Sequence, residues 1–113
     1  MNKEDLKICI SDLGMACLTT DYSETKLKCG TPGYVAPDVL KGDPFTTKSD
    51  IFSMGSFFFN LLTHSNLFQQ TNVKDMLLAN KYTNPIEAIQ NKVRNVSSEC
   101  KQLLKWMLQP HAE

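Results

Sequence analysis

The sequence has 113 residues, enough for at most one small domain. Its 12 Lys and Arg residues balance 12 Asp and Glu residues, so no net basic charge favours binding to nucleic acid or to a membrane surface. The four cysteines show no Cys-x-x-Cys spacing and follow no apolar signal segment. This pattern favours a reduced, cytoplasmic setting over a disulfide scaffold or a zinc site.

The first half of the chain predicts a short strand, a loop and one long helix. Residues 6–11 have the apolar and β-branched content of a strand, and residues 15–28 are polar without a sustained period, which predicts a mobile loop. Residues 49–64 are apolar around nearly the whole helical circumference, but this stretch is too short for a ~20-residue membrane span. We therefore expect a central helix that is buried on all sides.

The second half predicts three further helical segments. Residues 71–80 place Val73, Met76 and Leu77 on one side of a helix, with Asn80 at the margin of that side. Residues 86–93 predict one or two turns that start at Pro85. Residues 97–108 have apolar side chains at helical spacing and a capping residue, Ser97. The predicted fold is mainly α, with one strand at its start.

Three motifs occur in order: ISDLG at 10–14, CGTPGYVAPD at 29–38 and KSDIFSMG at 48–55. Together they resemble the eukaryotic protein kinase family, in the C-terminal lobe of the catalytic domain. D-L-G resembles the D-F-G that begins the activation segment, and A-P-D resembles the A-P-E that ends it. LLKWMLQP at 103–110 resembles a motif near the penultimate helices of the family.

The resemblance covers essentially the whole chain and implies a partial kinase domain over residues 1–113. Residues 1–14 would hold a strand and a metal-binding motif, and residues 15–38 the activation segment with the peptide shelf. Residues 48–64 would form the buried central helix of the lobe, and residues 71–108 its further helices.

The D-L-G motif implies a nucleotide site. By resemblance, Asp12 would be a ligand of the Mg²⁺ that neutralises the phosphates of ATP, and Gly14 would give the backbone freedom to orient that carboxylate. Taken alone, the same three residues are typical of a turn that ends a strand.

The C-G-T-P-G-Y motif implies a rigid shelf that positions the substrate peptide, formed by Thr31, Pro32, Gly33 and Tyr34. The Thr31 hydroxyl would meet the catalytic aspartate and lysine of the family. G-T-P-x-Y, in place of the P-x-K-W of tyrosine kinases, implies Ser/Thr specificity. The alternative is a surface loop rich in Pro and Gly that binds no ligand.

Four more residues receive roles by resemblance. Asp38 stands at the position of the A-P-E glutamate, and Gly55 is the glycine of the D-x-W-S-x-G motif. Asp50 heads the central helix, where the family buries an aspartate that accepts hydrogen bonds from the catalytic loop. Thr25 is a candidate phosphorylation site, although the usual position, two residues before C-G-T, holds Leu27.

Other parts of a kinase do not occur in these 113 residues: the Gly-rich loop, the strand lysine and the H-R-D-L-x-x-x-N catalytic loop. The resemblance therefore assigns no catalytic base here, and we expect a truncated chain or partial gene model without the N-terminal lobe and catalytic loop. The parent would transfer the γ-phosphoryl group of ATP to Ser or Thr of a protein or peptide, with Mg²⁺, and is most similar to the calmodulin-dependent kinase group. The rival hypothesis is a non-catalytic, kinase-like interaction module or pseudokinase fragment.

Overall fold

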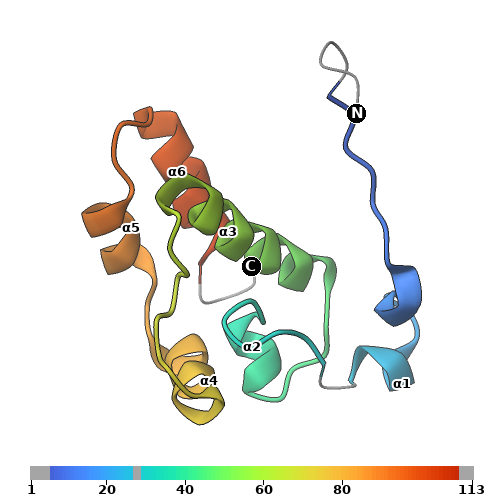
Figure 1. The fold of residues 1–113 in the computed structure, drawn as a ribbon. Helices are drawn as coiled ribbons and strands as arrows, with labels where there is room; N and C mark the ends of the chain where they lie inside the picture. Colours follow the sequence, from blue (N-terminus) through green and yellow to red (C-terminus); the bar gives the residue numbers. More distant parts are fainter. Residues whose placement is uncertain (1–5, 27–28, 110–113) are drawn as a thin grey trace.

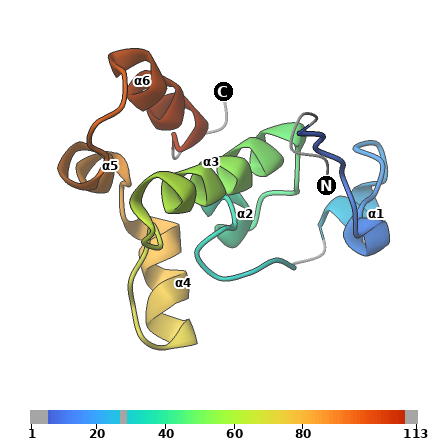
Figure 2. The ribbon, with the colours of Figure 1, turned by 45° about the horizontal axis from the view of Figure 1, so that its top comes forward.

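The computed structural model describes residues 6–26 and 29–109. Its elements in chain order are a 3-10 helix, η1 (Leu13–Met15), and the α-helices α1 (Tyr22–Thr25), α2 (Pro37–Leu40), α3 (Thr47–Thr63), α4 (Val73–Tyr82), α5 (Ile86–Lys92) and α6 (Ser98–Met107). The long helix α3 lies between α6 and α2 (Figures 1 and 2), while α4 packs against α2 and α5 against α6. The prediction of a mainly α fold is confirmed.

The strand predicted at residues 6–11 does not form. This stretch has no regular secondary structure and is exposed, with 98% of Ile8 accessible to solvent. A strand needs a neighbouring strand to satisfy its backbone hydrogen bonds, and the described residues contain no strand. The apolar pattern at Leu6, Ile8 and Ile10 therefore has no sheet to join within this part of the chain.

Helix α3 begins at a capping box. The Thr46 hydroxyl accepts a hydrogen bond from the Lys48 N–H at 3.2 Å, and the Ser49 hydroxyl accepts one from the Thr46 N–H at 2.9 Å. These bonds satisfy backbone groups that have no partner inside the helix. The helix ends where His64 adopts a left-handed conformation with φ of 56°.

The central helix is not buried on all sides. Phe52, Gly55 and Phe59 are buried and lie on one side of α3. A stripe on another side stays 42–57% exposed and consists of Ile51, Met54, Phe57 and Leu61. The pattern reported the apolar character of the helix correctly, but the described residues cover only part of its circumference.

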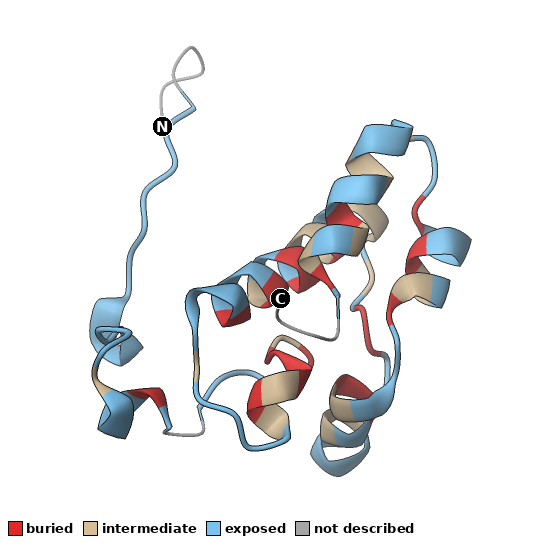
Figure 3. Ribbon diagram, turned by 180° about the vertical axis from the view of Figure 1, so that it is seen from behind, coloured by how far each residue is buried: buried red, intermediate tan, exposed pale blue. Residues whose placement is uncertain are grey.

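Buried residues gather where α3, α5 and α6 face one another and around α2 and α4 (Figure 3). The buried apolar core consists of Val35, Ala36, Val39, Phe52, Phe59, Leu67, Phe68, Ala79, Ile89, Val93, Leu104 and Leu108. The predicted cap of α6 is confirmed, because the Ser97 hydroxyl accepts a hydrogen bond from the Cys100 N–H at 3.1 Å. Helix α5 lies close to its predicted range of 86–93, whereas α4 begins and ends two residues later than the predicted 71–80.

The short helices α1 and α2 and the turn η1 were not predicted. Helix α1 interrupts the stretch expected to be a loop, and Asp21 caps it by accepting a hydrogen bond from the Glu24 N–H at 3.3 Å. The Ser23 hydroxyl, 2.7 Å from Asp21 Oδ1, and this N–H lower the pKa of Asp21 below its usual 3.8. Helix α2 starts with Pro37 in its first turn, where the missing N–H costs nothing.

Candidate functional site

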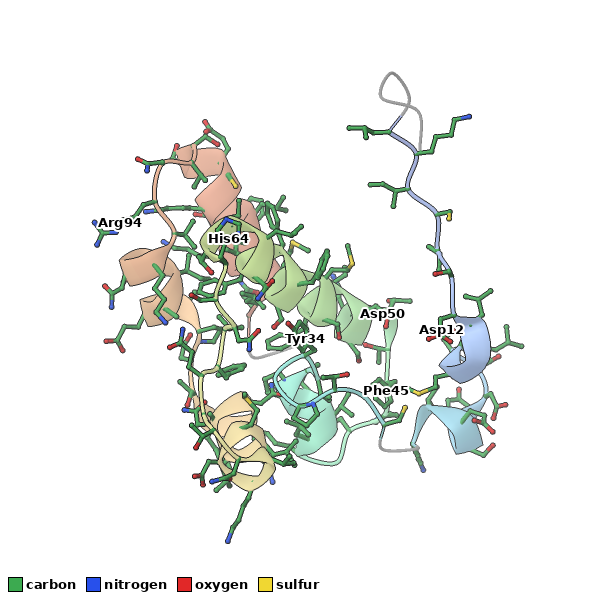
Figure 4. The ribbon with its side chains drawn as sticks, in the orientation of Figure 1. Asp12, Tyr34, Phe45, Asp50, His64 and Arg94 are labelled. Atoms are coloured by element: carbon green, nitrogen blue, oxygen red, sulfur yellow. The ribbon has the colours of Figure 1, made fainter. Side chains whose placement is uncertain are left out.

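Residues 31–34, which the sequence predicts to be a peptide shelf and which are called the shelf below, lie next to α3 and are fixed by hydrogen bonds to their backbone. The Ser56 hydroxyl donates to the Gly33 carbonyl at 2.9 Å, and the Ser53 hydroxyl donates to the Tyr34 carbonyl at 2.7 Å. Both serines belong to α3, so the central helix fixes the position of the shelf backbone. In Figure 4, Tyr34 lies between α2 and α3.

Two glycines allow the chain to turn at the shelf. Gly30 has φ of 125° and Gly33 has φ of 94°, and residues that carry a side chain rarely adopt such φ values. A Cβ atom on Gly30 would lie 2.9 Å from Cγ2 of Val35, so the chain there also approaches too closely for any side chain. Thr31 is exposed, and its carbonyl accepts a hydrogen bond from the Tyr34 N–H at 3.0 Å.

One residue that holds the shelf was not assigned a role from the sequence. Asn80 of α4 is fully buried; its Oδ1 accepts a hydrogen bond from the Gly33 N–H at 2.9 Å, and its Nδ2 donates to the Val35 carbonyl at 2.7 Å. The one signal in the sequence was an amide at the margin of the apolar side of α4. That signal does not reveal a partner about 45 residues away.

An apolar groove runs beside the shelf. It encloses about 280 Å³ and is lined by Cys29, Gly30, Pro32, Val35, Val39, Leu40 and Leu77. None of these side chains carries a formal charge, so the groove suits an apolar group.

Asp12 lies apart from the shelf (Figure 4), directly before η1, and Gly14 is the middle residue of η1. Asp12 is exposed and adopts the left-handed conformation, with φ of 59° and ψ of 65°. Gly14 does not have a positive φ, so the unusual backbone geometry predicted for the motif falls on Asp12 itself. Aspartate tolerates this conformation better than most residues do.

The stretch that holds η1 and α1 and the start of α3 enclose a cavity of about 320 Å³. Its lining comes from residues 15–30 and 45–53 and includes Cys17, Cys29, Thr25, Phe45 and Asp50. The Phe45 N–H donates to the Thr25 carbonyl at 2.7 Å and joins the two segments.

The expectation that Asp50 is buried is wrong for the described residues. Asp50 is exposed at the edge of this cavity, whereas its neighbour Ser49, also in the first turn of α3, is buried. An exposed carboxylate keeps its hydration, so Asp50 carries none of the desolvation cost expected for a buried charge.

Thr25, the candidate phosphorylation site, is only 3% exposed, and its hydroxyl has no hydrogen-bond partner among the described residues. Phosphorylation at Thr25 stays a prediction, and it requires α1 to move and release the hydroxyl. In the described structure the Thr25 hydroxyl is not accessible to a kinase.

We expect Thr25→Val to raise the free energy of unfolding by about 1 kcal/mol, because valine has nearly the same shape and removes a buried hydroxyl without a partner. Thermal unfolding checks this. Thr46→Val is the matched control with the opposite sign, since it removes the cap of α3 and costs about 1 kcal/mol. Destabilisation by Thr25→Val would show that its hydroxyl is bonded in solution.

The two remaining residues with expected structural roles, Gly55 and Asp38, lie in α3 and α2. Gly55 is buried where α3 meets α6, and a Cβ atom there would lie 2.9 Å from Leu108 Cγ and from Met107 Cβ. Asp38 is half-buried in the first turn of α2, where its carboxylate suits the positive end of the helix dipole. The Asp38 carbonyl accepts a hydrogen bond from the Asp43 N–H at 3.0 Å.

The arrangement therefore combines a rigid backbone shelf, an apolar groove beside it and a separate exposed carboxylate. Residues 6–26 and 29–109 contain no group of three or more His, Cys, Asp or Glu side chains able to hold a metal ion. No helix in these same ranges is long and apolar enough to cross a membrane. Binding an extended peptide is the chemistry that the shelf and groove support most directly.

Comparison with known proteins agrees with the sequence motifs. A probable serine/threonine-protein kinase 2 of Plasmodium falciparum is 36% identical over 98 residues, which cover 87% of this chain and 19% of that protein. Human testis-specific serine/threonine-protein kinase 1 is 34% identical over 113 residues, covering 95% of this chain and 30% of the relative. Calcium/calmodulin-dependent protein kinase type 1 of Caenorhabditis elegans is 41% identical over 76 residues, covering 59% and 22%.

The chain thus spans less than a third of the length of each of these three relatives. The family model for the protein kinase domain matches residues 1–113. The relatives include serine/threonine kinases and a calcium/calmodulin-dependent kinase, as the motifs indicated. The chain belongs to the protein kinase domain family.

Proposed function

We propose that the chain forms the peptide-binding part of a serine/threonine protein kinase, which transfers the γ-phosphoryl group of ATP to a Ser or Thr hydroxyl. The observation that carries this proposal is the backbone of Gly33 and Tyr34, held by side chains of α3 beneath an exposed Thr31. Phosphoryl transfer depends mainly on positioning and charge stabilisation, so a rigid peptide shelf is a substantial part of the machinery.

The residues present fit one ligand of a magnesium site. Asp12 is exposed, and its side chain makes no capping hydrogen bond to η1, so its carboxylate is accessible to a cation. Mg²⁺ usually takes one or two protein carboxylates together with phosphate oxygens and water. When bound, the ion would neutralise negative charge on the phosphates of ATP.

The cavity beside Asp50 is proposed to receive the catalytic loop of the complete kinase domain. Its rim carries hydrogen-bonding side chains from the start of α3, among them Thr47, Asp50 and Ser53. An exposed carboxylate there can accept backbone N–H bonds from an incoming segment. The catalytic base would come with that loop, and the nucleotide lysine with the N-terminal lobe.

A cytoplasmic location of the protein stays a prediction.

The direct test is transfer of labelled γ-phosphoryl from ATP to a mixture of Ser and Thr peptides by the full-length protein. We expect Mg²⁺-dependent incorporation that a chelator abolishes. Residues 1–113 alone should give none above background, because neither a base nor a nucleotide lysine is available. A full-length protein that binds peptides but transfers no phosphate would favour a pseudokinase or interaction module.

We expect the apolar groove to select the substrate residue that follows the phosphorylated one. Peptides with Leu at this position should react with a kcat/KM about ten-fold or more above those with Asp, because burying a leucine contributes about 1.5–3 kcal/mol. Steady-state kinetics on the paired peptides measure the ratio. Leu77→Ala should reduce this preference, whereas Val73→Ala, an exposed position on the same helix, should not.

A further inference from the structure

Asn80 is a buried polar residue of α4 whose hydrogen bonds go to another segment rather than to α4 itself. Its side chain is fully buried and uses both ends of the amide on backbone groups of another segment, the Gly33 N–H and the Val35 carbonyl. A buried amide without such partners would lower stability, so the two bonds explain why a polar residue is tolerated there.

Both polar backbone groups of Gly33 are bonded by side chains from different helices. The N–H donates to Asn80 of α4, and the carbonyl accepts from Ser56 of α3. With φ of 94°, the Gly33 backbone has a conformation that few residues adopt. Asn80 and Ser56 together hold Gly33 in this conformation, because a shift of the Gly33 backbone would break both hydrogen bonds.

We infer that Asn80 is a positioning residue for the substrate peptide: by fixing the backbone from Gly33 to Val35, it sets the shape of the shelf and of the groove beside it. This inference rests on the proposed function and goes beyond it by linking α4 to the peptide site. Val35 lines the groove, so loss of the bond to its carbonyl alters the surface that contacts the peptide.

Asn80 should affect peptide binding and not nucleotide binding. Asn80 bonds the segment next to the groove, whereas Asp12 lies directly before η1, apart from the shelf. A change at Asn80 should therefore weaken peptide binding and leave ATP binding unaltered.

The test compares Asn80→Ala with wild type in the full-length protein by amide hydrogen exchange at Gly33 and by steady-state kinetics. We expect exchange at Gly33 and the KM for peptide each to rise about ten-fold or more, because the variant removes both hydrogen bonds between Asn80 and the shelf segment. The KM for ATP should stay within about two-fold of wild type, since no lost bond contacts the nucleotide motif.

Asn72→Ala is the matched control. Asn72 caps α4 by accepting a hydrogen bond from the Asp75 N–H at 2.8 Å, so its loss destabilises the same helix without touching the shelf. This variant should leave Gly33 exchange and the peptide KM unchanged. Equal effects of both variants would overturn the inference, because they would show that only the stability of α4 matters.

Asn80→Asp keeps the test decisive if Asn80→Ala does not fold. Above the pKa of its carboxyl, which burial raises, this side chain can still accept from the Gly33 N–H but cannot donate to the Val35 carbonyl, so the assay is run at a pH where the carboxylate is ionised. We expect protection of the Gly33 amide with a raised peptide KM, and a wild-type KM would contradict the inference. A wild-type protein without phosphotransfer contradicts only the proposed function, because Gly33 exchange still decides whether Asn80 holds the shelf.

Discussion

Asp12→Asn is expected to lower kcat of the full-length protein about a hundred-fold or more, since a metal ligand at the phosphates contributes several kcal/mol to the charged transition state. Its melting temperature should not change, because Asp12 is exposed and its side chain makes no capping hydrogen bond. Asparagine is preferred to alanine here because it also tolerates the left-handed backbone at φ of 59°.

The control for the lost charge is Asp43→Asn, at another exposed aspartate. It should leave kcat unchanged. Measurement of kcat at several Mg²⁺ concentrations separates the two variants, because only Asp12→Asn should weaken the response to the metal. Wild-type kcat in Asp12→Asn would remove Asp12 from the nucleotide site.

Gly55→Ala should lower the free energy of unfolding by about 1–2 kcal/mol. The new methyl group would lie 2.9 Å from Leu108 Cγ and Met107 Cβ, and Leu108 is fully buried and has little room to move. Overpacking costs about 1–3 kcal/mol, which exceeds the roughly 0.5–1 kcal/mol that alanine gains over glycine inside a helix. Urea unfolding followed by Trp106 fluorescence measures the difference, because Trp106 lies beside Met107 on α6.

A double-mutant cycle with Leu108→Ala tests the cause of this loss. Leu108→Ala removes one of the two side chains that meet the new methyl group and by itself should cost about 2–5 kcal/mol. In that background the penalty of Gly55→Ala should become smaller without vanishing, because Met107 Cβ still lies 2.9 Å from the new methyl group. An unchanged penalty would locate the clash elsewhere.

Features that depend on neighbouring residues were the most predictable from the sequence. Ser97 and the apolar spacing after it suffice to predict α6, because capping and helical period act within a few residues. The same holds for α4 and α5. The strand at residues 6–11 failed for the opposite reason: a strand requires partners distant in sequence, and the described residues contain none.

The site shows the same division. The Gly30 and Gly33 positions could be predicted as turns, because positive φ is a local property of glycine. Asn80 could not be assigned, since its partners lie 45 and 47 residues away and amides are common at the margins of helices. The exposure of Asp50 was also beyond the motif, because burial depends on which segments cover a residue.

The acceptor residue gives the most direct test of the central claim, that this chain belongs to a serine/threonine kinase. Full-length protein is incubated with Mg²⁺ and labelled ATP on peptides that differ only in Ser, Thr or Tyr at the acceptor position, and the labelled amino acid is identified after acid hydrolysis. The account predicts label on phosphoserine and phosphothreonine, with loss of both in Asp12→Asn. Label on phosphotyrosine alone, or no label on any peptide, would contradict it.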